Sequence, residues 1–180
     1  ISISGHKIHA PKGIGGLYIR SGLRLKPFLA GGGQEDGRRA GTEAMPHIAA
    51  FAAACEAASP EMEENIARMA ALKSSALQLL HENIPEVSAL ETAAPHILSI
   101  SLPGWRSEVL MNFLEAREVY VSKSSACKKG GRSHVLEAIG MKPEAIDGAV
   151  RIGLSRFTTQ DDIDALVAGL TEARRVLKHR

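Results

Sequence analysis

Hydrophobic and polar residues follow patterns along the first third of the chain that predict two short strands, a loop and a helix. Residues 1–4 alternate apolar and polar positions, as a half-buried strand does, and residues 16–20 form a second short strand. Residues 29–42 contain five glycines and few apolar side chains, which predicts a long loop. Residues 44–58 are Ala-rich and apolar throughout, which predicts a buried helix with Cys55 as a small core residue.

A second helix is predicted to begin at Ser59-Pro60 and to continue to about Asn83. Serine is a good N-cap, proline is tolerated at the first helical position, and acidic residues suit the first turn. Apolar side chains then recur at three-to-four spacing and predict one core face, made of Met62, Ile66, Met69, Leu72, Ala76 and Leu79.

The rest of the chain predicts a small α/β unit. Apolar runs and helical periodicity place strands at 97–102, 119–122 and 149–154, and helices at 107–116, 133–139 and 159–177. The expected fold class is therefore α/β in two parts. Residues 1–58 are the end of one domain, and residues 59–180 are a small C-terminal domain whose short sheet is packed by helices.

Composition narrows the possible partners. Of the 180 residues 44% are hydrophobic, enough for a real core, and the formal net charge of +2 gives no overall attraction to nucleic acid or membrane. No apolar run approaches the roughly 18 residues of a membrane span. The two cysteines lie far apart and suit neither a disulfide framework nor a metal site. The basic tail at residues 174–180 is explained by a solvated helix end rather than by nucleic-acid binding. Together these observations lead us to expect no bound metal, no membrane and no nucleic acid.

Two segments in the first half carry candidate chemistry. A lysine after a strand, as in Ser4-Gly5-His6-Lys7, can form a Schiff base with a carbonyl cofactor such as pyridoxal phosphate (PLP), and Ser4 and His6 offer donors to its phosphate. The glycines of residues 31–41 and the Thr42 hydroxyl before a helix also suit a phosphate. On the residues alone, a solvated lysine and a surface loop are the simpler interpretations.

The third candidate is Cys127. Residues 119–136 contain no acid, and cations favour the thiolate, which is the reactive form of cysteine. This pattern indicates a nucleophile on a loop rather than a buried structural cysteine. Four cations surround the thiol in the sequence: Lys123, Lys128, Lys129 and Arg132.

Arg151 occupies an inward position of the strand at 149–154. A buried guanidinium needs an anionic partner, because leaving it alone is costly. A substrate carboxylate held as a bidentate pair and a structural Asp or Glu both remain open.

Taken in order, these motifs resemble the C-terminal half of the cysteine desulfurases, which are PLP enzymes of the class V aminotransferase group. The resemblance extends from Ser4 to Asp164. The matching stretches are SGHKIHAPKGIGGLYIR (4–20), GGGQEDGRRAGT (31–42), HILSISLPG (96–104), VSKSSAC (121–127), SHVLEAIG (133–140) and VRIGLSRFTTQDDID (150–164).

The resemblance implies a role for each candidate residue. Lys7 corresponds to the lysine that binds PLP covalently, and Ser4 and His6 correspond to ligands of its phosphate. Thr42 corresponds to a phosphate contact in the partner subunit. Cys127 corresponds to the nucleophile that accepts sulfur, and Arg151 to the arginine that holds the substrate carboxylate.

The implied activity converts L-cysteine to L-alanine and leaves a persulfide on Cys127 for acceptor or scaffold proteins, including those of iron–sulfur cluster assembly. The implied protein is a cytoplasmic homodimer. Family members are about twice this length, so we expect the 180 residues alone to be inactive. We also expect the segment 44–58 to expose apolar surface that the other half covers.

Two other functions remain open. Another class V aminotransferase or a selenocysteine lyase would keep the role of Lys7 and make Cys127 dispensable for some activities. A non-catalytic domain that carries sulfur or mediates dimerisation would need no complete cofactor site.

Overall fold

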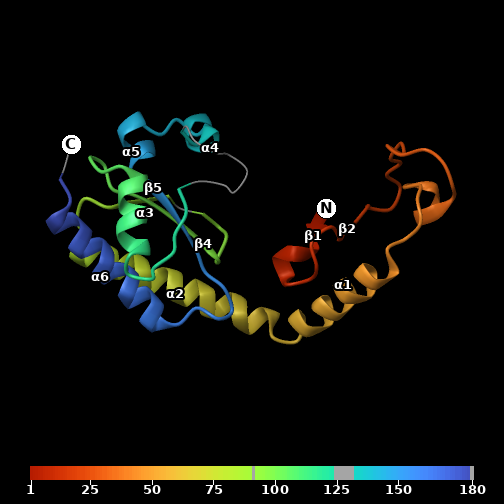
Figure 1. The fold of residues 1–180 in the computed structure, drawn as a ribbon, viewed down its shortest axis with the longest axis horizontal. Helices are drawn as coiled ribbons and strands as arrows, with labels where there is room; N and C mark the ends of the chain where they lie inside the picture. The colour runs from red at the N-terminus through yellow and green to blue at the C-terminus, as the bar shows by residue number, and fades with distance from the viewer. Residues whose placement is uncertain (91, 124–131, 179–180) are drawn as a thin grey trace. The chain divides into compact units, whose positions relative to one another are not determined.

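The computed structural model describes residues 1–90, 92–123 and 132–178. The chain divides into two compact units, Ile1–Met62 and Glu63–Arg180 (Figure 1). The sequence predicts a boundary after residue 58. Residues 59–62 therefore belong to the first unit by their contacts.

The first unit begins with a hairpin. Strands β1 (Ser2–Ser4) and β2 (Gly15–Leu17) pair antiparallel, and β1 runs directly into a short 3₁₀ helix, η1 (Gly5–Ile8). The Gly5 N–H donates to the Ile14 carbonyl oxygen at 2.9 Å, and a Cβ on Gly5 would lie 2.9 Å from that same oxygen. A residue without a side chain is therefore needed where β1 enters η1.

The predicted loop at 29–42 contains one further 3₁₀ helix, η2 (Gln34–Gly37). The predicted helix at 44–58 is confirmed as α1 (Met45–Ala58), but the prediction that it is buried is wrong. None of its residues is buried, and Cys55 is exposed instead of lying in a core. The reason is that α1 packs mainly on η1, with Phe51 also close to Gly16 of β2, so apolar side chains on its other sides have no cover.

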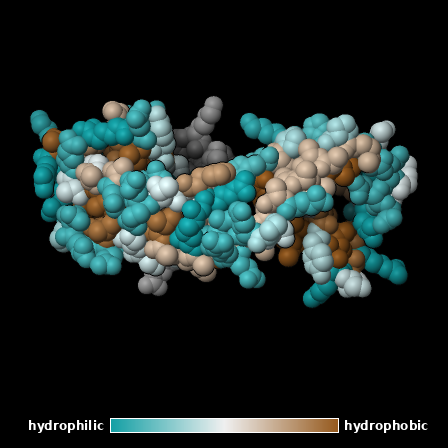
Figure 2. Space-filling view, turned by 90° about the horizontal axis from the view of Figure 1, so that it is seen from below, coloured by the Kyte–Doolittle hydropathy of each residue, from teal (hydrophilic) through white to brown (hydrophobic). Residues whose placement is uncertain are grey.

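Apolar side chains gather on the surface of this unit, as expected for the segment 44–58 (Figure 2). They come from the hairpin, from the following loop and from α1. The large exposed ones are Ile1, Ile3, Leu17, Tyr18, Leu23, Leu25, Phe28, Leu29 and Met45.

The helix predicted from Ser59 begins later, as α2 (Met62–Asn83). Ser59 does not cap it: the Ser59 N–H donates to the Cys55 carbonyl oxygen at 3.0 Å and so ends α1. The first part of the predicted core face is also wrong, because Met62 and Ile66 are exposed. The buried positions come later in the helix and are Leu72, Ala76 and Leu80.

The second unit is built on a three-stranded antiparallel sheet in the order β3 (Ser88–Leu90), β4 (Ile97–Ser101) and β5 (Ala149–Gly153). The sequence predicts β4 and β5 but not β3. The strand predicted at 119–122 is wrong for its first three residues. Only Ser122 pairs, in an isolated bridge to Arg151 of β5.

Helices cover both faces of this sheet. Val150 and Ile152 face the main core, which α2, α3 (Ser107–Glu115) and α6 (Gln160–Val176) complete. On the other face, α4 (His134–Ala138) and α5 (Pro143–Asp147) pack on Ala149 through Leu136 and Ile146. The sequence predicts α3, α4 and α6 but not α5. The expected α/β fold class is confirmed.

No helix in the described parts of the chain combines the length and apolar character that a membrane span requires.

Candidate functional site

Three candidate side chains lie together where β1 ends. Ser4 is the last residue of β1, and His6 and Lys7 belong to η1. All three residues are exposed, while Gly5 between them is buried. A hydroxyl, an imidazole and a primary amine are thus presented to solvent on one short turn that is fixed by its glycine.

Thr42 is not brought to this group within the chain. It is exposed, and it follows Gly41, whose N–H donates to Gln34 Oε1 at 3.2 Å. No hydrogen bond among the described residues joins Thr42 to Ser4, His6 or Lys7. Within the first unit, η2 lies away from η1 (Figure 1).

Arg151 is the middle residue of β5 and is half-buried. Its cross-strand neighbours are Ser99 of β4 on one side and Ser122 on the other. By the alternation of a strand, its side chain shares the face of Ala149, on which α4 and α5 pack. Its guanidinium has no ion-pair or hydrogen-bond partner among the described residues, so the structural Asp or Glu that the sequence left open is not found there.

Cys127 and the neighbouring residues 124–131 lie outside the described residues. The cations on either side of them are described, and each is paired with an acid. Lys123 forms an ion pair with Glu108 of α3, and Arg132 donates from Nε and Nη2 to the two carboxylate oxygens of Asp147, at 2.7 Å each.

These ion pairs correct the sequence interpretation of a basic, acid-free environment. Glu108 and Asp147 are each fifteen residues from their partners in the chain, so the local sequence contains no sign of them. The hydrogen bond from Lys123 lowers the pKa of Glu108, and the hydrogen bond from Arg132 lowers the pKa of Asp147. Both acids are therefore ionised at neutral pH and offset the charge of two of the four cations.

One pocket of about 270 Å³ is lined by five charged side chains: Arg106, Glu108, Lys123, Arg132 and Asp147. We call it the charged pocket. Its position is set by α3, by the end of α5 and by the residues on both sides of 124–131.

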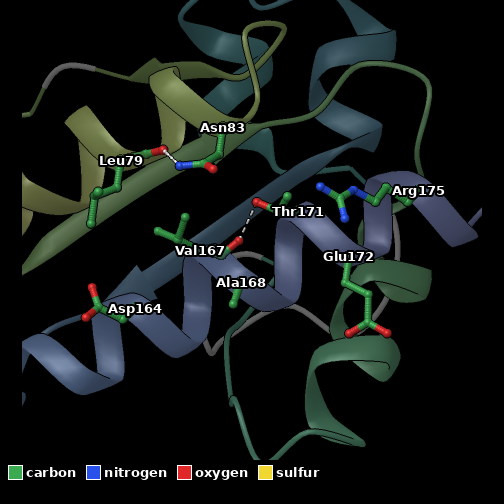
Figure 3. A pocket seen from close by; sticks show the side chains of 8 residues that line it. All are labelled: Leu79, Asn83, Asp164, Val167, Ala168, Thr171, Glu172 and Arg175. Carbon is green, nitrogen blue, oxygen red and sulfur yellow. Dashed lines mark hydrogen bonds between the residues drawn. The ribbon is translucent and has the colours of Figure 1, made fainter.

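Two other hollows of the second unit lie apart from the candidate residues. A groove of about 390 Å³ separates α2 from α6 (Figure 3). Two of its side chains bond within their own helices: Asn83 donates to the Leu79 carbonyl, and Thr171 donates to the Val167 carbonyl. A pocket of about 430 Å³ separates residues 119–121 from the end of β5, where the predicted strand does not pair.

No cluster of three or more His, Cys, Asp or Glu side chains in the described parts of the chain could hold a metal ion.

The chain is similar to cysteine desulfurases over nearly all of its length. It is 40% identical to "Cysteine desulfurase 2" of Trichormus variabilis over 171 residues, which is 93% of this chain and 43% of that protein. It is 34% identical to "Cysteine desulfurase IscS" of Methanosarcina thermophila, over 99% of this chain and 45% of that protein. The chain thus spans less than half the length of these relatives.

A solved structure described as a "NIFS-LIKE PROTEIN" has the same fold. It superposes with a TM-score of 0.82 at 35% identity, over 98% of this chain and 46% of that one. The family described as "Aminotransferase class-V" matches residues 1–166. This chain belongs to the class-V aminotransferase family.

Proposed function

We propose that this chain is the C-terminal half of a PLP-dependent cysteine desulfurase. One observation carries the proposal beyond family membership. Ser122 pairs directly with the backbone of Arg151, so a residue whose guanidinium has no partner among the described residues lies beside Ser122, and Cys127 follows five residues later in the sequence. A carboxylate-binding group and a thiol are two of the groups that removal of sulfur from a cysteine requires.

The residues at the end of β1 fit PLP. The support comes from the hydrogen-bond donors present: an exposed amine, hydroxyl and imidazole lie on one turn, and the buried Gly5 places no side chain between them. Ser4 and His6 would donate to the phosphate, and Lys7 would bind the aldehyde carbon. When bound, PLP supplies an electron sink for the substrate's α-carbon.

Each residue of the chain then has a defined task. Lys7 Nζ takes the proton from the substrate Cα and returns one to the product. Arg151 holds the substrate carboxylate in a bidentate pair, which orients the sulfur. The Cys127 thiolate attacks that sulfur, so the substrate C–S bond breaks while an S–S bond forms. The β-carbon gains a proton, alanine leaves, and the persulfide remains on Cys127.

The exposed position of Thr42 supports a homodimer. Thr42 is exposed and forms no hydrogen bond to Ser4, His6 or Lys7 of its own chain among the described residues, so its hydroxyl is available to the phosphate of a partner subunit. We extend the proposal to delivery of the persulfide sulfur to an acceptor or scaffold protein of iron–sulfur cluster assembly, in the cytoplasm.

The test uses the full-length parent. L-cysteine is added, alanine is quantified, and the mass of the Cys127 peptide is measured. Alanine together with one added sulfur on that peptide is the expected result, and Cys127→Ala should abolish both. Cys55→Ala is the matched control, because Cys55 is the other thiol of the chain and should leave both unchanged. Alanine without added sulfur would favour a lyase that does not need Cys127.

A further inference from the structure

The groove between α2 and α6 carries opposite charges at its two ends (Figure 3). Asp164 lies near the start of α6 and Arg175 near its end, and both are exposed. Ala168 and Thr171 line the groove between them. Because eleven residues make about three turns of an α-helix, Asp164 and Arg175 project from the same side of α6, about 16 Å apart along its axis. The groove therefore has an acidic end, a centre of small side chains and a basic end.

These two charges have no opposite charge beside them in the part of the chain that the structure describes. The Arg175 guanidinium forms no ion pair or hydrogen bond with any described residue. The Asp164 carboxylate accepts a hydrogen bond from Gln160 at 2.8 Å, and that donor is an uncharged amide. Glu172, which also lines the groove, is already paired with Arg117. Asp164 and Arg175 are therefore available to charges on a partner.

The arrangement of these side chains along α6 is complementary to its own reverse. Asp164 and Arg175 lie equally far from the midpoint of residues 169 and 170, and so do Ala168 and Thr171. An antiparallel α6 from a second copy, centred on that midpoint, would place each Asp164 opposite an Arg175 and each Ala168 opposite a Thr171. Such an interface has two-fold symmetry, in which every contact occurs twice. The small side chains at its centre allow the two helices to approach closely.

We propose that this groove binds α6 of a second copy of the chain, in an antiparallel contact that is oriented by two Asp164–Arg175 ion pairs. A partner with charges of one sign would match one end of the groove and be repelled at the other, whereas a second copy matches both ends. Leu79 of α2, which is half-buried, adds apolar contact along the wall of the groove. The contact is separate from the homodimer proposed through Thr42, and it does not depend on the proposed function.

The first test is sedimentation of the 180-residue chain at a series of concentrations. Asp164→Arg places two cations opposite each other in both pairs, and Arg175→Asp places two acids there. Each variant alone should self-associate about tenfold more weakly than the unaltered chain, because two exposed ion pairs become repulsive. A mixture of the two variants should restore the association, because each new charge then meets an opposite charge on the other variant.

Glu115→Arg is the matched control, because it makes the same charge change on an exposed residue at the end of α3, outside the groove. It should leave self-association unchanged. The apolar surface of the first unit is the same in every variant, so differences between variants report on the groove. The proposal is overturned by an unaltered chain that stays monomeric, by equal weakening in Glu115→Arg, or by a mixture that associates no better than the single variants.

Disulfide cross-linking then tests the antiparallel register. The chain carries Cys55→Ala and Cys127→Ala, so that its native thiols do not react. A mixture of A168C and T171C chains should form mostly mixed disulfides, because these positions lie opposite each other, whereas identical positions are offset by about 4.5 Å along the helix axis. Equal amounts of mixed and like disulfides, measured by mass spectrometry, would overturn the register. Neither measurement needs cofactor or activity, so failure of the proposed function would leave both outcomes readable.

Discussion

The Arg151 guanidinium is half-buried on a sheet face and lacks an acidic partner among the described residues. Burying part of a charge without a partner costs free energy, which a bound carboxylate would recover. The backbone of Arg151 is fixed on both sides, by β4 and by Ser122. The point on the sheet from which its side chain projects is therefore fixed before a substrate arrives.

Arg151→Lys in the full-length parent should raise the KM for L-cysteine by about ten- to a hundredfold. Lysine keeps the charge but loses the second parallel hydrogen bond, and charged hydrogen bonds are worth about 1.5–3 kcal/mol. Steady-state kinetics checks the value. Arg117→Lys is the control: Arg117 forms a bidentate pair with Glu172 and stacks on Phe113, so this change should lower stability and leave KM unaltered. An unchanged KM in Arg151→Lys would remove Arg151 from the substrate site.

Some positions of single residues can be predicted from the sequence, and others cannot. The inward position of Arg151 follows from a local pattern, because a strand alternates its faces. The positions of Glu108 and Asp147 beside Lys123 and Arg132 do not follow from a local pattern. These acids belong to α3 and to α5, and the sequence did not predict α5. Residues 119–136 contain no acid, but in the folded chain Glu108 and Asp147 lie beside them.

At the scale of elements, amphipathic segments are predictable and segments that depend on distant partners are not. The closing helix α6 has a full capping box, in which Thr159 and Asp162 bond each other's backbone N–H, and its buried stripe is readable from spacing. By contrast, Ser59-Pro60 has every local mark of a helix start, yet Ser59 ends α1. The strand at 119–122 fails for the same reason: its residues have β propensity, but only Ser122 among them pairs with β5.

Gly148, between α5 and β5, should not tolerate a side chain. A Cβ there would lie 2.1 Å from the Leu102 carbonyl oxygen, and that backbone is held because the Leu102 N–H donates to the Gly148 carbonyl oxygen. We expect Gly148→Ala to lower the free energy of unfolding by about 1–3 kcal/mol, as overpacking does. Urea unfolding measures it. The control is Gly153→Ala, where a Cβ meets nothing within 4 Å, and it should be close to neutral. Equal effects of the two changes would refute the close approach at Gly148.

At the scale of the whole molecule, four carboxylates in the described parts of the chain have a pKa below the ordinary value because each accepts hydrogen bonds from a fixed donor. They are Glu108 with Lys123, Asp147 with Arg132, Asp162 with Thr159, and Glu172 with Arg117. A carboxylate whose pKa is lower in the folded state adds stability above its unfolded pKa of about 4, and the gain is lost as pH falls through the folded pKa.

The free energy of unfolding should therefore be level between about pH 5 and 7 and fall as the pH drops below about 4. Urea titrations at a series of pH values check this profile. Asp162→Asn removes one of these carboxylates and should reduce the steepness of the fall, while being less stable than the unaltered chain at pH 7. A variant with the same slope as the unaltered chain would show that Asp162 does not contribute.

The two units differ sharply in how much core they have. In the first unit Ala10 is the single buried hydrophobic residue among those described, whereas the second unit holds a continuous core from α2 to α6. An Ala-rich helix of 14 residues such as α1 is marginal in water without packing. The stability of the 180-residue chain should therefore reside in the second unit.

Hydrogen exchange measures this difference directly. Amides of β4, β5 and α6 should exchange only by global opening, whereas amides of α1 should exchange by local opening. A gap of about 5 kcal/mol, the low end of domain stability, corresponds to exchange more than a thousandfold slower in the second unit. Repeating the measurement at several protein concentrations separates folding from self-association through the apolar surface of the first unit, since only the latter depends on concentration. Protection of α1 equal to that of β4, and independent of concentration, would show that the first unit is stable without a cover.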